Sequence, residues 1–212
     1  IDGFSDARNQ VEVVKSKEAF ERGDYEAGID YIYNIGGTVN VTYDADGGSA
    51  SSLNQTIKSK QYIDNEANRT GYDFYGWVQE DYELNNKKNN YRVDLSLKAS
   101  WEPITYTITY QLNGGRFNEV EPTSYNIEIG AVIPNPERVG YTFTGWSQTL
   151  NDEKVFDLEI EPNTIVGNQH YIANWVANTY TITYNPNGGS LATQTQEVIY
   201  DQEFVLLIPT TM

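Results

Sequence analysis

Three sequence motifs recur in the same order along this chain, and their repetition limits the possible folds more than any other property. Tyr-x-x-(Asp/Asn)-Gly-Gly occurs at Tyr43–Gly48, Tyr110–Gly115 and Tyr184–Gly189. Gly-Tyr-x-Phe-x-Gly-Trp occurs at Gly71–Trp77 and Gly140–Trp146, and each copy is followed by a segment that ends in Trp, Leu95–Trp101 or Tyr171–Trp175. The equivalent tyrosines are 67 and 74 residues apart. A period of this length predicts an array of small, similar units.

The motifs divide the chain of 212 residues into three parts after residue 36. We place the first repeat unit at residues 37–103, the second at 104–178 and the front half of a third at 179–212. The linkers Glu102–Pro103 and Val176–Ala177 are short. Neighbouring units are therefore expected to touch and to form an elongated, semi-rigid array.

Residues 1–36 fit two interpretations. Tyr31–Ile35 resembles the segment Tyr171–Trp175 and stands similarly before the next motif, which favours the degenerate back half of a preceding repeat. The alternative is a helical linker, with a helix over about 17–31 that Ser16 caps. Two glycines inside that helix weaken it by about 1 kcal/mol each relative to alanine. We favour the half repeat, with room for a short helix inside it.

Apolar and polar residues alternate where each unit begins. Val39, Val41 and Tyr43 alternate with polar residues in the first unit, as Tyr106, Ile108 and Tyr110 do in the second. This period of two predicts a strand with one buried face, and the Gly-Gly pair that follows suits a tight turn. Each unit is predicted to hold about four strands and one small helical element, a strand-rich α+β fold.

The second unit gives the clearest strand boundaries. Strands are expected over Ser124–Val132, Tyr141–Trp146 and His170–Trp175. Two prolines, at positions 134 and 136, end the first of them, and Gly145 permits a bulge in the next. Apolar spacings over Phe156–Ile165 predict a turn of helix.

These motifs resemble the Listeria–Bacteroides repeat, the B-repeat of the internalin family and of many other bacterial surface proteins. The second unit matches that pattern along its length, including Ile133–Pro136 and Ala173–Trp175, whereas the first has Ile63–Ala67 where prolines belong. The resemblance covers about residues 37–212. It implies a β-grasp, ubiquitin-like fold for each unit. It also implies bacterial surface display or secretion, often in tandem between a ligand-binding head and a cell-wall anchor.

The charge balance excludes several classes of function. Lys and Arg total 14 against 30 Asp and Glu, a net charge of −16, which repels nucleic-acid phosphates and anionic lipids. There is no cysteine, which agrees with export from a Gram-positive bacterium, and His170 is the single histidine, so thiolate and multi-histidine metal sites are excluded. No apolar run could span a bilayer, and no signal peptide or cell-wall sorting motif is recognised. We expect no nucleic-acid partner, no membrane insertion and no cofactor.

Carboxylates are the residues that could still support chemistry. They cluster at Asp152/Glu153, Asp157/Glu159/Glu161 and Asp201/Glu203. Nothing in the sequence places two of them across a cleft, as glycoside hydrolysis requires, and the repeats do not share them. We therefore expect no enzyme and no catalytic or cofactor-binding residue.

The segment Asp44-Ala-Asp46-Gly47 resembles the opening of a calcium-binding loop. The later ligands of such a loop are missing, so we interpret the segment as a turn and expect no metal site.

Aromatic residues at repeat-equivalent positions are expected in the core. Tyr75, Tyr82 and Tyr91 are not repeat-equivalent and are the candidates for contacts with a partner. Lys98 lies inside an apolar strand, where a lysine could form an intramolecular isopeptide crosslink. Its alternation with Leu97 favours a solvated strand edge instead.

Two functional hypotheses remain. The first is a non-catalytic stalk or spacer and adhesion module at a bacterial surface, whose partners are the neighbouring repeats of its parent chain. The alternative is a binding module that engages a host protein or glycan through an exposed strand edge or an aromatic patch. The hairpin predicted over Thr179–Pro209 cannot bury its inner face alone. We expect it to pair with a neighbouring unit, another chain or the N-terminal segment.

Overall fold

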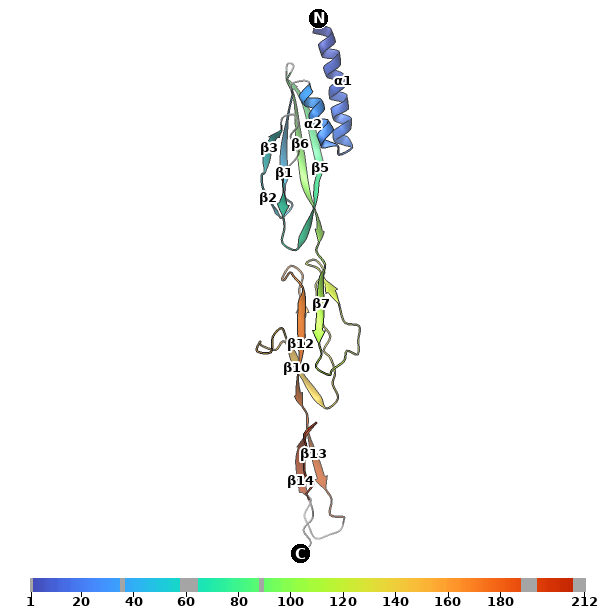
Figure 1. The fold of residues 1–212 in the computed structure, drawn as a ribbon, viewed down its shortest axis with the longest axis vertical. Coiled ribbons are helices and arrows are strands. Elements are labelled where there is room, and N and C mark those ends of the chain that lie inside the picture. The colour runs from blue at the N-terminus through green and yellow to red at the C-terminus, as the bar shows by residue number, and fades with distance from the viewer. Residues whose placement is uncertain (1, 35–36, 58–64, 88–89, 188–193, 208–212) are drawn as a thin grey trace. The chain divides into compact units, whose positions relative to one another are not determined.

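Two helices come first along the chain and strands follow, as Figure 1 shows for the computed structural model. The structure describes residues 2–34, 37–57, 65–87, 90–187 and 194–207. They fall into two units, residues 1–104 and 105–212. The chain is a strand-rich α+β protein with mixed sheets, as the sequence predicts.

The elements of the first unit are α1 Asp2–Glu21, α2 Tyr25–Asn34, β1 Thr38–Asp44, β2 Ser49–Ala50, β3 Asn54–Ile57, β4 Ala67–Asn68, β5 Tyr72–Lys87 and β6 Asn90–Pro103. Those of the second are β7 Tyr106–Gln111, β8 Ser124–Tyr125, β9 Ala131–Val132, β10 Tyr141–Ser147, β11 Glu159–Ile160, β12 Gln169–Ala177, β13 Thr179–Tyr184 and β14 Gln194–Ile199.

The N-terminal segment is a pair of helices, so the favoured half-repeat interpretation is wrong. Tyr31 lies in the last turn of α2 rather than in a strand. The helical alternative is nearer, but α1 begins well before Ser16, which is therefore not a cap. The Ser16 hydroxyl is buried and donates a hydrogen bond to the Gly28 carbonyl in α2, at 3.0 Å. Gly23, with φ of 75°, makes the turn between the helices, and the Asp24 carboxylate caps α2 by accepting the Ala27 N–H.

Both units contain the same four-stranded mixed sheet. In the first unit the order is β3–β1–β6–β5, with β1 and β6 parallel and the outer pairs antiparallel. In the second the order is β8–β7–β12–β10, with β7 and β12 parallel. In each of the first two repeats, the first strand therefore lies at the centre of its sheet beside the last strand of that repeat.

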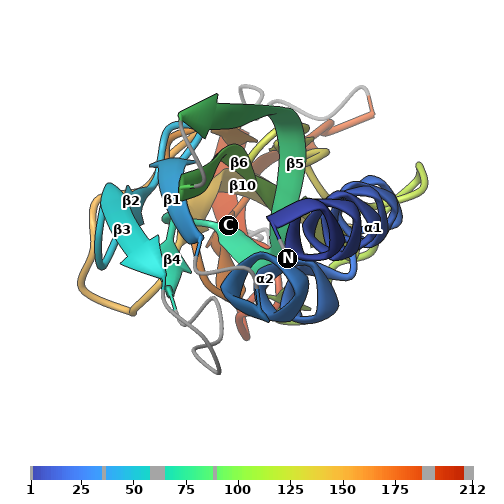
Figure 2. The same ribbon diagram turned by 90° about the horizontal axis from the view of Figure 1, so that it is seen from above.

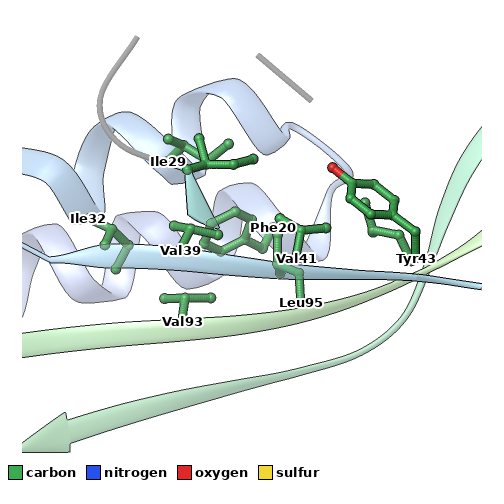
Figure 3. Packing of buried hydrophobic residues seen from close by; sticks show 10 residues of the cluster. Phe20, Ile29, Ile32, Val39, Val41, Tyr43, Val93 and Leu95 are labelled. Carbon is green, nitrogen blue, oxygen red and sulfur yellow. The ribbon is translucent and has the colours of Figure 1, made fainter. Parts of the chain in front are cut away.

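The two helices close the core of the first unit. Figure 2 shows α1 and α2 packed together beside the sheet. In Figure 3, Phe20, Ile29 and Ile32 lie between the helices and the strands, against side chains such as Val39 and Leu95. The alternating residues Val39, Val41 and Tyr43 are all buried, as predicted. These helices belong to the folded unit and are not a linker outside it.

The second unit closes its core without helices among the residues that the structure describes. Trp146 is its largest fully buried side chain, and it packs with Ile108, Tyr125, Ile133 and Tyr171. Most of this core comes from the strands β7, β8, β10 and β12, with loop residues completing it.

Two expectations for the second unit are wrong and one is confirmed. The strand expected over 124–132 is broken after β8, because the Asn126 side chain accepts the N–H groups of Glu128 and Ile129 and forms a turn. The segment 156–165 contains the short strand β11, paired with β9, and no α-helix. The bulge expected at Gly145 is present, with φ of 125° and a register shift after Phe143.

The front half of the third repeat is a two-stranded antiparallel hairpin. β13 and β14 pair from Thr179 with Ile199 to Tyr184 with Gln194. Beyond β14, residues 204–207 are exposed apolar side chains, and the end of the hairpin predicted at residue 209 lies outside the described residues.

Candidate functional site: the junction of the second and third repeats

The carboxylates named from the sequence support local structure. The Asp152 carboxylate accepts the Thr149 N–H at 2.7 Å, and its hydrogen bonds to the Thr149 side chain and backbone lower its pKa. The Asp157 carboxylate accepts a hydrogen bond from the Asn135 amide at 2.7 Å. Asp152, Glu153 and Glu159 line one hollow of about 290 Å³ beside Trp146. Asp201 instead lines a different cleft, described below.

The segment Asp44–Gly47 has the geometry of the turn expected from the sequence. The Asp44 carboxylate accepts the Asp46 N–H at 2.9 Å, and the third repeat makes the same bond between Asn185 and Asn187. The Asp46 carboxylate lies 3.2 Å from the Lys98 ammonium. Within the described residues, no group of three or more His, Asp or Glu side chains could hold a metal ion. Lys98 is partly exposed and ion-paired, but the strand edge expected for it is wrong, because β6 lies inside its sheet between β1 and β5.

Among the tyrosines proposed to contact a partner, Tyr75 is 79% exposed. The side chains of Tyr82 and Tyr91 lie outside the described part of the chain. Tyr75 follows Phe74 at the bulge of β5, which is the edge strand of its sheet. The exposed ring therefore stands at a sheet edge.

The tyrosine that begins each Tyr-x-x-(Asp/Asn)-Gly-Gly motif makes an equivalent hydrogen bond in all three repeats. The hydroxyls of Tyr43, Tyr110 and Tyr184 donate to an oxygen of the residue twelve positions later, at 2.7, 2.7 and 2.6 Å. Burial raises the pKa of Tyr43 to about 12 and also raises the pKa of Tyr110. The bond ties β3 to β1 in the first repeat and β14 to β13 in the third, whereas in the second it ties the loop before β8 to β7.

Sequence reasoning missed an arginine that both complete repeats share. Arg69 and Arg138 each stand two residues before the glycine of Gly-Tyr-x-Phe-x-Gly-Trp. Their guanidinium groups lie 3.9 and 3.6 Å from the ring centroids of Tyr72 and Tyr141. On the other side, each arginine lies close to the first glycine of the Gly-Gly turn. The recurring Arg-x-Gly-Tyr was the signal that could have identified these stacks.

The second repeat is joined to the third by a close contact at Gly140. The Tyr200 ring lies so near Gly140 that a Cβ there would overlap atoms of the ring. Gly140 also has φ of 77°, which side chains rarely adopt. The Tyr141 ring meets the Tyr200 ring edge-on at 5.5 Å between centroids, and the Tyr141 hydroxyl donates to the Asp201 carboxylate at 3.2 Å.

Hydrogen bonds complete this junction. The Asn178 N–H donates to the Gly140 carbonyl at 2.9 Å, and the Tyr200 N–H donates to the Asn178 carbonyl at 2.9 Å. The Thr142 hydroxyl donates to the Asn178 side chain at 2.6 Å. The residue between β12 and β13 is thereby fixed to both repeats. We call this set of contacts, centred on Gly140, Asn178 and Tyr200, the Gly140 joint.

A cleft of about 750 Å³ opens beside the Gly140 joint. Its walls come from the Gly-Gly turn, the Arg-x-Gly-Tyr segment, β10, β12 and the end of β14. The lining residues are Gly114, Arg116, Pro136, Glu137, Arg138, Val139, Tyr141, Phe143, Trp175, Tyr200 and Asp201. We call it the joint cleft. It combines two arginines with four aromatic rings and two carboxylates, whereas the charged residues that line the hollow beside Trp146 are all acidic.

Comparisons with known proteins place these features in a family. The model of the Listeria-Bacteroides repeat domain matches residues 40–99, 106–168 and 180–212. Two proteins of Evansella cellulosilytica are similar: "Putative Gly-rich membrane protein", 30% identical over 79% of this chain, and "Putative membrane protein", 33% identical over 48%. The chain spans only 19% and 15% of those relatives. No solved structure matches, and none of the described helices has the length and apolarity needed to cross a membrane.

Proposed function

Because this chain belongs to the Listeria–Bacteroides repeat domain family, we propose that it is a non-catalytic, semi-rigid stalk segment of a bacterial surface or secreted protein. In this role the repeats hold other parts of the parent protein at a set distance and orientation. The names of the relatives, which describe membrane proteins, support a location at the cell surface. The family match over three segments supports a tandem array.

We further propose that each repeat is a β-grasp unit. The observation that supports this is the shared sheet order, in which the first strand is central, antiparallel to the second and parallel to the last. In the first unit α1 and α2 cover that sheet. The second unit fills the corresponding space with aromatic side chains and loops.

The Gly140 joint is the observation that carries the stalk proposal. A flexible tether would leave the residues between repeats without partners, whereas Asn178 is hydrogen-bonded on both sides and Tyr200 is seated on Gly140. A contact that requires glycine at one position and a ring at the other restrains the angle between repeats. Such restraint is what a semi-rigid spacer needs.

Hydrogen exchange of Gly140→Ala and Tyr200→Ala tests the joint. The first variant inserts a Cβ where the ring lies, and the second removes the ring. We expect amide exchange at Asn178, Tyr200 and the β13–β14 hairpin to become about 10- to 100-fold faster, while β10 and β12 stay protected. The matched control is Gly71→Ala, because Gly71 has φ of 81° at the equivalent position of the first unit. It imposes the same backbone strain and should leave the β13–β14 hairpin unchanged.

If both Gly140→Ala and Tyr200→Ala leave exchange of the hairpin at its original rate, the joint does not restrain the third repeat and the stalk proposal fails. If β10 and β12 lose protection to the same extent as the hairpin, the variants have unfolded the second repeat. Tyr200→Ala, which adds no backbone strain, then decides between the two interpretations.

A further inference from the structure

Positive charge is concentrated in the joint cleft although the unit around it is strongly acidic. Residues 105–212 contain three Lys or Arg and twelve Asp or Glu. Two of the three cations, Arg116 and Arg138, line the joint cleft, and Lys154 does not. Only two of the twelve carboxylates, Glu137 and Asp201, line it as well. The two arginines thus balance the two carboxylates of the cleft, in a unit whose remaining charges are mostly negative.

Both guanidinium groups remain available to a ligand. Among the described residues, neither Arg116 nor Arg138 makes a side-chain hydrogen bond or an ion pair, and the Arg138 guanidinium lies between the Tyr141 ring and Gly114. The Asp201 carboxylate accepts the Tyr141 hydroxyl. A guanidinium group presents several N–H donors in a planar fork that matches a carboxylate.

The remaining walls of the joint cleft are aromatic. Tyr141, Phe143, Trp175 and Tyr200 line it, and none of the four is fully buried. Aromatic faces pack against the apolar C–H faces of a pyranose ring, and a hollow of this volume holds ligands of one or two rings. A bare phosphate ion would leave these walls unused.

We propose that the joint cleft binds a sugar residue that carries a single carboxylate. The two arginines recognise the carboxylate, and the aromatic walls hold the sugar ring. The acidic surface around the cleft disfavours a polyanion, so one isolated acidic sugar suits the site better than a chain of them. The inference goes beyond the stalk role, but it rests on the Gly140 joint, because Tyr200 and Asp201 of the third repeat form one side of the cleft.

Comparison with the first repeat separates structural from binding residues. Arg138 has a counterpart, Arg69, that stacks on Tyr72 in the same way, so the stack belongs to the framework of the repeat. Arg116 has no such counterpart, since the position after the Gly-Gly turn of the first unit is Ser49. Arg116 therefore marks the second repeat as the one with a binding cleft.

The test is titration of the whole chain with methyl β-glucuronide and with the neutral methyl β-glucoside, followed by NMR. We expect the glucuronide to shift the indole N–H signal of Trp175 with millimolar affinity. Arg116→Ser gives the second repeat the residue of the first, and we expect it to weaken binding about tenfold or more. The matched control is Lys154→Ser, which removes the same charge outside the cleft and should leave affinity within about twofold.

Three results would overturn the proposal: equal binding of the glucoside and the glucuronide, equal losses from Arg116→Ser and Lys154→Ser, or no shift at Trp175 at all. Preferential binding of acetylglycine or inorganic phosphate over the glucuronide would assign the arginines to a peptide carboxylate or a phosphate. If the Gly140 joint does not fix the third repeat, amide hydrogen exchange of β13–β14 is fast in the unaltered chain, and this measurement is independent of sugar binding. A stable hairpin without sugar binding would refute the binding site alone.

Discussion

At the scale of single residues, several glycines leave room for an aromatic ring of another segment. In the first and second repeats, the second glycine of the Gly-Gly turn packs under the closing tryptophan. A Cβ on Gly48 would lie 2.6 Å from Trp101, and a Cβ on Gly115 would overlap the Trp175 ring. The same indoles donate hydrogen bonds to backbone carbonyls of that turn, Ala45 and Leu112. The repeated Gly-Gly and Trp motifs are therefore two halves of one contact.

Replacement of Gly115 by alanine tests this contact. Because a methyl group would overlap the Trp175 ring, we expect the second unit to lose about 1–3 kcal/mol of unfolding free energy. Urea unfolding followed by tryptophan fluorescence measures the loss. Thr107→Ala, at an exposed strand position, is the control and should stay within about 0.5 kcal/mol. Equal stability of the two variants would show that the tryptophan can move aside without cost.

Tyr43 is a buried tyrosine of the first repeat, and we expect its ionisation to lower the stability of that unit at alkaline pH. The pKa of Tyr43 is raised from 10.0 to about 12 in the folded protein because burial disfavours the phenolate. A pKa that is higher in the folded state gives stability that is complete below pH 10 and declines between about pH 10 and 12. Tyr43→Phe cannot ionise, so the decline in the first unit should become shallower.

The measurement is the unfolding free energy of Tyr43→Phe at pH 8 and at pH 11, with hydrogen exchange of β1 and β6 to identify the first unit. The variant also loses the hydrogen bond to Gln55, so we expect it to be about 1 kcal/mol less stable at pH 8. Tyr75→Phe changes an exposed ring and serves as the control. An unchanged alkaline slope in Tyr43→Phe would argue against the predicted titration.

At the scale of elements, the two helices of the first unit occupy a place that the second unit fills in another way. α2 contacts the central strands β1 and β6, and Phe20 from α1 reaches the same core. Gly28 allows the helices to approach, because a Cβ there would lie 2.5 Å from the Phe20 ring. The helices and the sheet therefore form one cooperative core.

Phe20→Ala tests whether the helices stabilise the sheet. Phe20 is 1% exposed, and truncation of a buried phenylalanine costs about 3–5 kcal/mol. We expect that loss in the first unit, with protection of β1 and β6 reduced and that of β10 and β12 unchanged. Val14→Ala, on an exposed part of the same helix, should change stability by less than about 0.5 kcal/mol. If protection of β1 persists in Phe20→Ala, the helices are an accessory to a sheet that folds alone.

The sequence predicted those strand features that are set by a few neighbouring residues. The alternation over Val39–Tyr43 and the bulge at Gly145 were predictable because side-chain period and glycine conformation are properties of a few neighbouring residues. The helices at the N-terminus were missed because a short likeness between Tyr31–Ile35 and a later strand outweighed the helical alternative. The break after β8 depends on the Asn126 side chain, and apolar spacing does not record such turns.

The candidate site was less predictable because its parts come from distant segments. Tyr200 reaches Gly140 across sixty residues, and no periodic signal links them. The sequence identified the first glycine of Gly-Tyr-x-Phe-x-Gly-Trp as unusual, but it gave no sign that the Tyr200 ring packs against it. Arg138 was missed although Arg-x-Gly-Tyr occurs twice, because the motif used for the prediction begins at the glycine and leaves out the arginine two residues before it.

At the scale of the whole molecule, the repeats contribute unequally to stability. The core of the second repeat contains residues from 106 to 175 and none from β13 or β14. The β13–β14 hairpin has two strands, which is marginal for independent stability, and it depends on the Gly140 joint. We therefore expect the folding of the third repeat to depend on the second repeat, whereas the folding of the second repeat does not depend on the third.

A pair of variants measures that direction. Ile133 is 2% exposed in the core of the second repeat, and Ile133→Ala should cost about 2–5 kcal/mol. Because the hairpin relies on that repeat, exchange should accelerate both in β10 and β12 and in β13 and β14. Tyr180→Ala removes a half-exposed ring of β13 that lies 6.4 Å from the Tyr200 ring. It should accelerate exchange in β13 and β14 alone.

Amides of β1 and β6 serve as the internal reference in both variants, because they belong to the other unit. If the hairpin stays protected while Ile133→Ala opens the second repeat, the hairpin folds independently and the one-way dependence is wrong. If Tyr180→Ala also exposes β10 and β12, the two repeats form a single cooperative unit. In the proposed stalk, the one-way result has a mechanical meaning: the second repeat provides the surface on which the third is fixed, through the Gly140 joint.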